Sequence, residues 1–196
     1  FVDIGATTRE EAEAKVQIGD VAVYVTNFVE MGSRVSSGAL DDRIACAAVV
    51  EAFRTMQNVH DVYAVFTVQE EVGLRGAGAA AYAIEPDLNI SLDVTGTGDT
   101  PKCGRMSVKL GAGATVKVMD SSVIVPPVVR AFLAEAADEK NIRWQPEVLR
   151  AGGTDTGAVQ RARGGILSGC ISIPTRYIHS PVETADMGDY EAAVQL

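Results

Sequence analysis

Short apolar runs rich in β-branched residues alternate along this chain with segments of helical periodicity. Residues 62–68 form a continuous β-rich run, which is typical of a strand covered on both faces. Val129, Phe132 and Leu133 fall at helical spacing after two prolines, which predicts an amphipathic helix. Because strands alternate with helices, the pattern predicts an α/β fold in which helices sandwich a mixed, largely parallel sheet.

The other elements are expected by the same criteria. We expect strands over 1–4, 21–25, 88–92, 106–110, 114–118 and within 165–173, and helices over 9–15, 43–56, 73–83, 156–163 and from 189 onward. Thr8 and Glu11 form a capping-box pattern at the first helix. The helix expected at 9–15 is polar, whereas the one expected at 43–56 is mostly apolar. Residues 1–35 are therefore expected to be a small separate unit and 36–196 the main domain.

Charge and cysteine content narrow the functional classes. The net charge is −9 over 196 residues, so a phosphate backbone would repel this chain and nucleic-acid binding is not expected. The sequence has no apolar stretch long enough to cross a membrane. Cys46, Cys103 and Cys170 share no metal-binding spacing and favour a reducing, cytoplasmic compartment. The first residue is Phe1, not Met, and we expect both ends of a longer polypeptide to be missing.

Acidic residues and one histidine lie where strands end or a helix begins. Glu70 and Glu71 follow the run 62–68, Asp93 follows 88–92, and His179 follows the strand near 173. Asp41 precedes the first long helix. In open α/β sheets ligands bind beyond the carboxyl ends of strands, so these side chains are expected to converge.

Converging carboxylates repel each other unless a cation lies among them. Carboxylates with one imidazole suit Zn²⁺, Co²⁺ or Mn²⁺. One of the adjacent glutamates would bind metal while the other moves protons. Taken singly, each residue has a plainer interpretation: Asp41 as a helix cap, Glu70 and Glu71 as solvated acids, Asp93 as a turn residue, and His179 as a core histidine.

Several motifs in order resemble the glutamyl/deblocking aminopeptidase family, whose dodecameric members are called tetrahedral aminopeptidases. They are Ala-Leu-Asp-Asp-Arg at 39–43, Val-Gln-Glu-Glu-Val-Gly at 68–73, Ser-Leu-Asp-Val-Thr at 91–95, Gly-Gly-Thr-Asp at 152–155 and Ile-Pro-Thr-Arg-Tyr-Ile-His-Ser-Pro at 173–181. The opening residues 1–6 and 9–12 are similar to that family too. The resemblance covers essentially the whole chain.

The resemblance implies a metal-dependent aminopeptidase that removes N-terminal residues from peptides. Asp41 would bridge two divalent ions, Glu71 and His179 would complete the shell of one, and Asp93 would bind the other. Glu70 would be the general base toward the metal-bridging water. The resemblance also implies a dimer-based homo-oligomer, up to a dodecamer, with residues 1–35 as the remnant of a small inserted dimerisation domain.

The sequence indicates less clearly which residues bind substrate, and it lacks one metal ligand that the family carries upstream. Gly153, Thr154 and Asp155 either line the groove or begin the next helix, and Arg176 either faces a substrate carboxylate or pairs with an acid. The family's His-x-Asp motif is absent from this chain. His60 precedes the run 62–68 at the wrong end for a site, and we expect it to be structural or exposed.

Two other functions stay open at this point. Paired carboxylates without metal hydrolyse glycosides, which would make the protein cellulase-like and indifferent to chelators. Without the upstream ligand, the chain would alternatively be an inactive fragment or a subunit that only assembles. Metal content separates these hypotheses.

Overall fold

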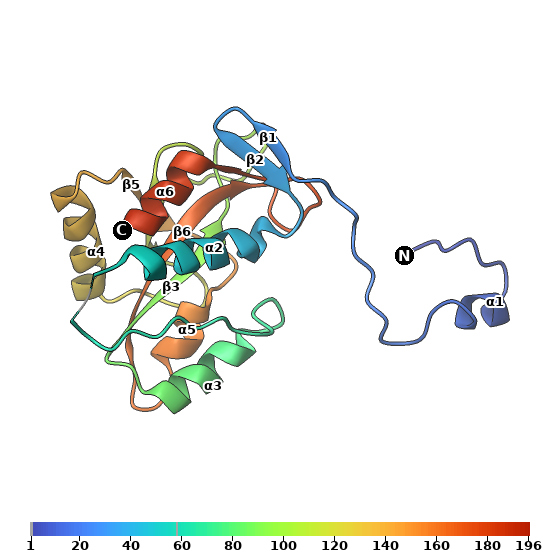
Figure 1. The fold of residues 1–196 in the computed structure, drawn as a ribbon, viewed down its shortest axis with the longest axis horizontal. Coiled ribbons are helices and arrows are strands. Elements are labelled where there is room, and N and C mark those ends of the chain that lie inside the picture. Colours follow the sequence, from blue (N-terminus) through green and yellow to red (C-terminus); the bar gives the residue numbers. More distant parts are fainter. Residues whose placement is uncertain (1, 58) are drawn as a thin grey trace.

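The computed structural model of this chain describes residues 2–57 and 59–196, and Figure 1 shows the elements. Its helices are α1 (Arg9–Glu13), α2 (Leu40–Thr55), α3 (Arg75–Ile84), α4 (Pro127–Glu139), α5 (Asp155–Gln160) and α6 (Met187–Gln195). Its strands are β1 (Val29–Met31), β2 (Arg34–Ser37), β3 (Leu88–Thr95), β4 (Ala114–Met119), β5 (Trp144–Val148), β6 (Leu167–Arg176) and β7 (Glu183–Asp186).

Strand β6 organises the sheet. It pairs in parallel with the whole of β3, so that Leu88 lies opposite Leu167 and Thr95 opposite Pro174. It pairs antiparallel with β4, which continues in parallel to β5. The end of β6 pairs antiparallel with β7, which leads through β2 to β1. The sheet is mixed and flanked by helices, which confirms the predicted α/β class, and β3 and β6 end at the same edge.

The core lies between this sheet and helices α2, α4 and α6. Helices α2 and α6 contact each other, and α2 also contacts β3 (Figure 1). The buried residues Ile44 and Ala48 of α2 lie one turn apart, so they face the sheet residues Val94 and Ile173 in one apolar cluster. Fully burying a valine or isoleucine side chain contributes about 1.5–3 kcal/mol. This packing fixes the start of α2 against the end of β3.

A buried ion pair joins three strands. The side chains of Lys117 on β4 and Glu147 on β5 are fully buried and paired. Thr95 Oγ1 donates to Glu147 Oε1 at 2.9 Å, and Thr115 Oγ1 donates to Oε2 at 2.6 Å. Asp120 Oδ2 lies 3.5 Å from Lys117 Nζ. Buried charges are tolerated when they are paired and hydrogen-bonded, and this network connects the end of β3 to β4 and β5.

The prediction of a buried strand over 62–68 is wrong. These residues form no strand and have no strand partner among the described residues, and Tyr63, Phe66 and Val68 are exposed. Both this segment and β3 line a hollow of about 560 Å³, and β3 forms its ladder with β6. A strand needs a neighbour to satisfy its backbone, and an apolar run does not supply one.

Three other expected strands also did not form. Residues 2–4, 21–25 and 106–110 carry no strand, while Phe1 lies outside the described residues. Apolar side chains alone predicted these strands, but 21–25 are exposed along an arm without sheet neighbours. In contrast, β7 was missed because its buried residues are mostly polar.

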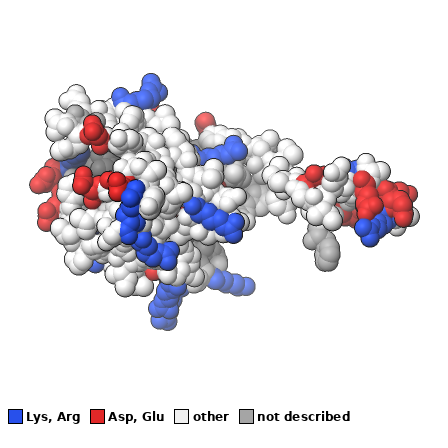
Figure 2. All heavy atoms as spheres, turned by 90° about the horizontal axis from the view of Figure 1, so that it is seen from below, with Lys and Arg blue, Asp and Glu red and all other residues white. Residues whose placement is uncertain are grey.

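Residues 2–28 form an arm that reaches away from the body and carries α1 near its end (Figure 1). The capping box at α1 is present, since Thr8 Oγ1 accepts from Glu11 N at 3.2 Å. Figure 2 shows acidic side chains gathered on this distant helix. The hairpin β1–β2 joins the main sheet through β7, and a domain boundary at residue 35 stays a prediction. Among the described residues, no helix combines the length and apolarity needed to cross a bilayer.

Candidate metal centre

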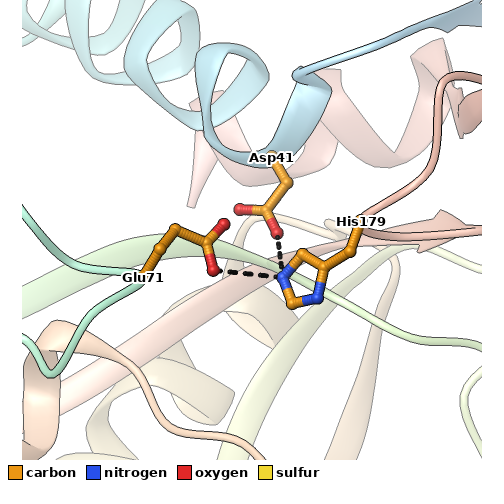
Figure 3. A group of neighbouring side chains, drawn as sticks. All are labelled: Asp41, Glu71 and His179. Atoms are coloured by element: carbon orange, nitrogen blue, oxygen red, sulfur yellow. Dashed lines mark ion pairs between the residues drawn. The ribbon is translucent and has the colours of Figure 1, made fainter. Parts of the chain in front are cut away.

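The predicted ligands come from elements that meet at the shared edge of β3 and β6. Asp41 lies in the first turn of α2, Glu71 in the turn before α3, and His179 in the loop between β6 and β7. Figure 3 shows their side chains pointing toward one another. His179 Nε2 lies 3.1 Å from Asp41 Oδ2 and 3.2 Å from Glu71 Oε2. Residues distant in sequence therefore supply one nitrogen and two oxygens to a single point.

A second group lies beside the first and shares Asp41 with it. Asp41, Asp42 and Asp93 each place a carboxylate oxygen within 4.8 Å of the others. The sequence predicted Asp93 here but did not mark Asp42 as a candidate ligand. The signal that was available is the adjacency of Asp41 and Asp42 directly before a buried helix.

The donor set fits divalent ions. Bonds of about 2.0–2.1 Å in tetrahedral geometry separate neighbouring ligand atoms by about 3.3 Å, close to the two distances around His179. In the second group, Asp42 Oδ1 is buried and has no hydrogen-bond partner among the described residues. An unpaired buried carboxylate oxygen among other acids is a strong ligand for a cation. The residues present thus fit divalent cations, in two groups that have Asp41 in common.

Without a cation the cluster resists ionisation. Burial, followed by the nearby Glu71 carboxylate, raises the pKa of Asp41 to about 6. Burial and the charge of Asp93 raise the pKa of Asp42 to about 9. Burial also raises the pKa of Asp93 well above its usual value. Each shift has the same cause, namely several carboxylates withdrawn from water at one place.

Glu70 lies beside these groups but is not a member of either. Burial, followed by the charges of Asp155 and Glu71, raises the pKa of Glu70 to about 7. A carboxyl group with a pKa near neutrality can both accept and return a proton at physiological pH. Glu70 can therefore exchange a proton near neutrality and, unlike Asp41, belongs to neither ligand group.

These shifts predict how the stability of the metal-free protein varies with pH. Acids whose folded pKa is raised favour the folded state when protonated, so stability falls as pH rises from about 4 toward 9. Between pH 5.5 and 7.5 we expect a loss of ~2 kcal/mol, or a Tm lower by roughly 4–8 °C. Calorimetry of the chelator-treated protein at the two pH values measures this.

Two comparisons isolate the cause of that slope. Asp42→Asn should flatten it, whereas the exposed Asp87→Asn should leave it unchanged. Saturating Zn²⁺ should raise Tm more at pH 7.5 than at pH 5.5, because the ion binds the ionised carboxylates. A metal-free Tm that rises between pH 5.5 and 7.5 would contradict the argument.

The residues expected to bind substrate have partners of their own. Arg176 pairs with Asp99, its Nη2 lying 2.8 Å from Asp99 Oδ2, and this hydrogen bond helps lower the pKa of Asp99 to about 2. Thr154 is buried and precedes α5, and Gly153 packs near Ser122. Asp155 Oδ2 accepts from Thr67 Oγ1 at 2.5 Å, beside Glu70. His60 is exposed and belongs to neither ligand group. Substrate contact by Gly153, Thr154, Asp155 and Arg176 stays a prediction.

Comparison with known proteins gives consistent matches. The family model described as M42 glutamyl aminopeptidase matches residues 1–196. A relative from Acetivibrio thermocellus is 54% identical over 100% of this chain and 60% of its own length. The lysyl aminopeptidase of Pyrococcus furiosus is 39% identical over 100% of this chain and 57% of its own. This chain thus spans little more than half the length of these relatives.

Solved structures agree with the sequence matches. Aminopeptidase APDkam598 from Desulfurococcus kamchatkensis superposes with a TM-score of 0.90 at 39% identity, over 98% of this chain and 56% of that one. The Pyrococcus horikoshii TET1 peptidase, described as assembling into a tetrahedron or a large octahedral shell, superposes with a TM-score of 0.80 at 34% identity, over 99% of this chain and 58% of that one. The family model covers the whole sequence, and on that basis the chain belongs to the M42 glutamyl aminopeptidase family.

Proposed function

We propose that the protein containing this chain is a dinuclear metal-dependent aminopeptidase that removes N-terminal residues from peptides. The observation that carries this proposal is the pair of ligand groups sharing Asp41, with the protonatable Glu70 beside them. Family membership and the aminopeptidase names of the relatives support the same reaction class.

Each residue has a distinct role in this proposal. Asp41 contributes to both ion sites, Glu71 and His179 complete one, and Asp93 binds the other with Asp42 at its side. The ions, Zn²⁺, Co²⁺ or Mn²⁺, would polarise the scissile carbonyl and make an attacking water more acidic. Glu70 takes the proton from that water and returns it to the leaving amine. The family's His-x-Asp ligand would have to come from outside these 196 residues.

We further propose that the protein forms a homo-oligomer, built on dimers as in shell-forming relatives. Residues 1–35 would belong to a small dimerisation unit, and the arm of residues 2–28 exposes Ile18, Val21 and Val25, which suits burial against another surface. The free cysteines support a cytoplasmic setting. The acidic composition argues against nucleic acid as a partner, and the aminopeptidase names of the relatives support peptide substrates.

Metal content of the intact protein tests the proposed reaction directly. We expect two divalent ions per chain, loss of aminopeptidase activity on chelation, and recovery on addition of Zn²⁺ or Co²⁺. Mass spectrometry of the metals and hydrolysis of aminoacyl anilides measure these properties.

Other outcomes would point to the alternative functions. Chelator-resistant cleavage of a polysaccharide would instead indicate a glycosidase that uses paired carboxylates. That chemistry gives no role to His179 or to the further acids around it, which makes it the weaker hypothesis. Absence of bound metal and of activity would indicate an inert assembly subunit.

A further inference from the structure

We propose that Glu183 is a positioning residue that holds two metal-ligand segments in register, an inference that rests on the proposed function. Glu183 begins β7, and it is buried, with 2% of its surface exposed. Its two carboxylate oxygens accept from different backbone N–H groups. Oε1 accepts from His179 N at 2.8 Å, and Oε2 accepts from Asp41 N at 2.9 Å.

Both segments that Glu183 holds have unusual backbone geometry. His179 has φ +61° and Tyr177 has φ +60°, a left-handed conformation that costs a residue with a side chain. Ala39, which leads into Asp41, has φ +57°. Such conformations persist when surrounding contacts determine them, and a charged acceptor is a strong contact of this kind.

The backbone of Glu183 is itself held in the sheet. Glu183 lies opposite Ser37 of β2 in the sheet, and the next residues of β7 pair with the end of β6. The carboxylate therefore ties the loop after β6 to the start of α2, elements far apart in sequence. Without this carboxylate, Asp41 and His179 would keep their side chains. The two hydrogen bonds that fix their backbone segments relative to each other would be lost.

A carboxylate is required because it offers two acceptor oxygens. Glutamine has nearly the same shape, but its amide NH₂ would meet one of the two N–H donors and lose that hydrogen bond. Groups outside the ligand shell that orient metal ligands commonly change metal affinity about 10–100-fold when replaced. Glu183→Gln should therefore weaken Zn²⁺ binding by about that factor.

The chain offers a matched control in Asp189. Its fully buried carboxylate also accepts from two backbone N–H groups, Gly111 N at 2.6 Å and Gly113 N at 2.7 Å, but these belong to no ligand segment. Asp189→Asn should lower Tm to a similar degree and change Zn²⁺ affinity less than about 3-fold, below the range for ligand-orienting groups. In the intact protein, Zn²⁺ and Co²⁺ titrations of both variants, with the Co²⁺ absorption spectrum, separate positioning from general stability.

Amide exchange in the metal-free protein gives a second readout. Glu183→Gln should speed exchange at the Asp41 and His179 amides, while Asp189→Asn should speed it at Gly111 and Gly113. If Glu183→Gln does not fold, Glu183→Asp, whose shorter side chain cannot reach both amides, replaces it.

The possible outcomes are distinct. Equal losses of Zn²⁺ affinity in the Glu183 and Asp189 variants would overturn the positioning role of Glu183. Unchanged amide exchange at Asp41 and His179 in Glu183→Gln would overturn it too. A wild-type protein that binds no ion would overturn the proposed function instead, and the exchange result would still decide whether Glu183 holds the two segments.

Discussion

Replacing Glu70 by glutamine is expected to lower kcat by about 10²–10⁴-fold while bound metal stays unchanged. The amide keeps the shape of Glu70 but cannot accept a proton from water. Because Glu70 lies outside both ligand groups, its loss should not release an ion. Steady-state kinetics with metal analysis of the same sample measures both properties.

The control for this variant is Glu135→Gln, an exposed acid on α4 far from the cluster. It should retain full activity and metal content. A Glu70→Gln protein with near wild-type turnover would show that another residue is the base, with Asp155 as the next candidate. Metal loss in Glu70→Gln would show that Glu70 is a ligand.

Asp41→Ala is expected to have the largest effect on metal binding, since Asp41 alone belongs to both ligand groups. We expect affinity for both ions to fall by more than ~100-fold, beyond the range for residues that only orient ligands. Activity should fall with it. Competition titration with a chromophoric zinc chelator gives the affinity.

The same variant should gain stability once metal is removed. Because the pKa of Asp41 is raised to about 6, its ionised form opposes folding at pH 7.5, and a neutral residue removes that penalty. The gain is on the order of 1–2 kcal/mol. The exposed Asp87→Ala should change neither property. A metal-free Asp41→Ala protein less stable than wild type by several kcal/mol would contradict the electrostatic account.

The expected ligands could be located from sequence because one rule governs their position. Asp93 lies near the end of β3, which runs on to Thr95, and His179 follows β6; because β3 and β6 are parallel neighbours, both residues lie at one edge of the sheet. Asp41 and Glu71 reach that edge from helix starts. Those residue types at strand ends predicted the cluster, although the clustering alone does not show what each residue does.

Other parts of the site could not be predicted, because they depend on contacts between residues distant in sequence. Glu183 contacts two backbone N–H groups, and a backbone contact leaves no pattern in side-chain identity. Lys117 and Glu147 form a buried pair, but nothing in the sequence distinguishes them from charged residues on the surface. Residues 62–68 look like a core strand, but pairing depends on a neighbour that composition does not reveal.

The run 62–68 has no strand partner among the described residues and is separated from Glu70 and Glu71 only by Gln69, whereas Asp41, Asp93 and His179 are held by α2, β3 and the Glu183 carboxylate. Segments with few buried contacts open at lower free energy than paired strands. The segment that carries Glu70 and Glu71 is therefore expected to open at lower free energy than the elements that carry Asp41, Asp93 and His179. We therefore expect heat or denaturant to displace Glu70 and Glu71 before it unfolds the core, so that loss of activity precedes global unfolding.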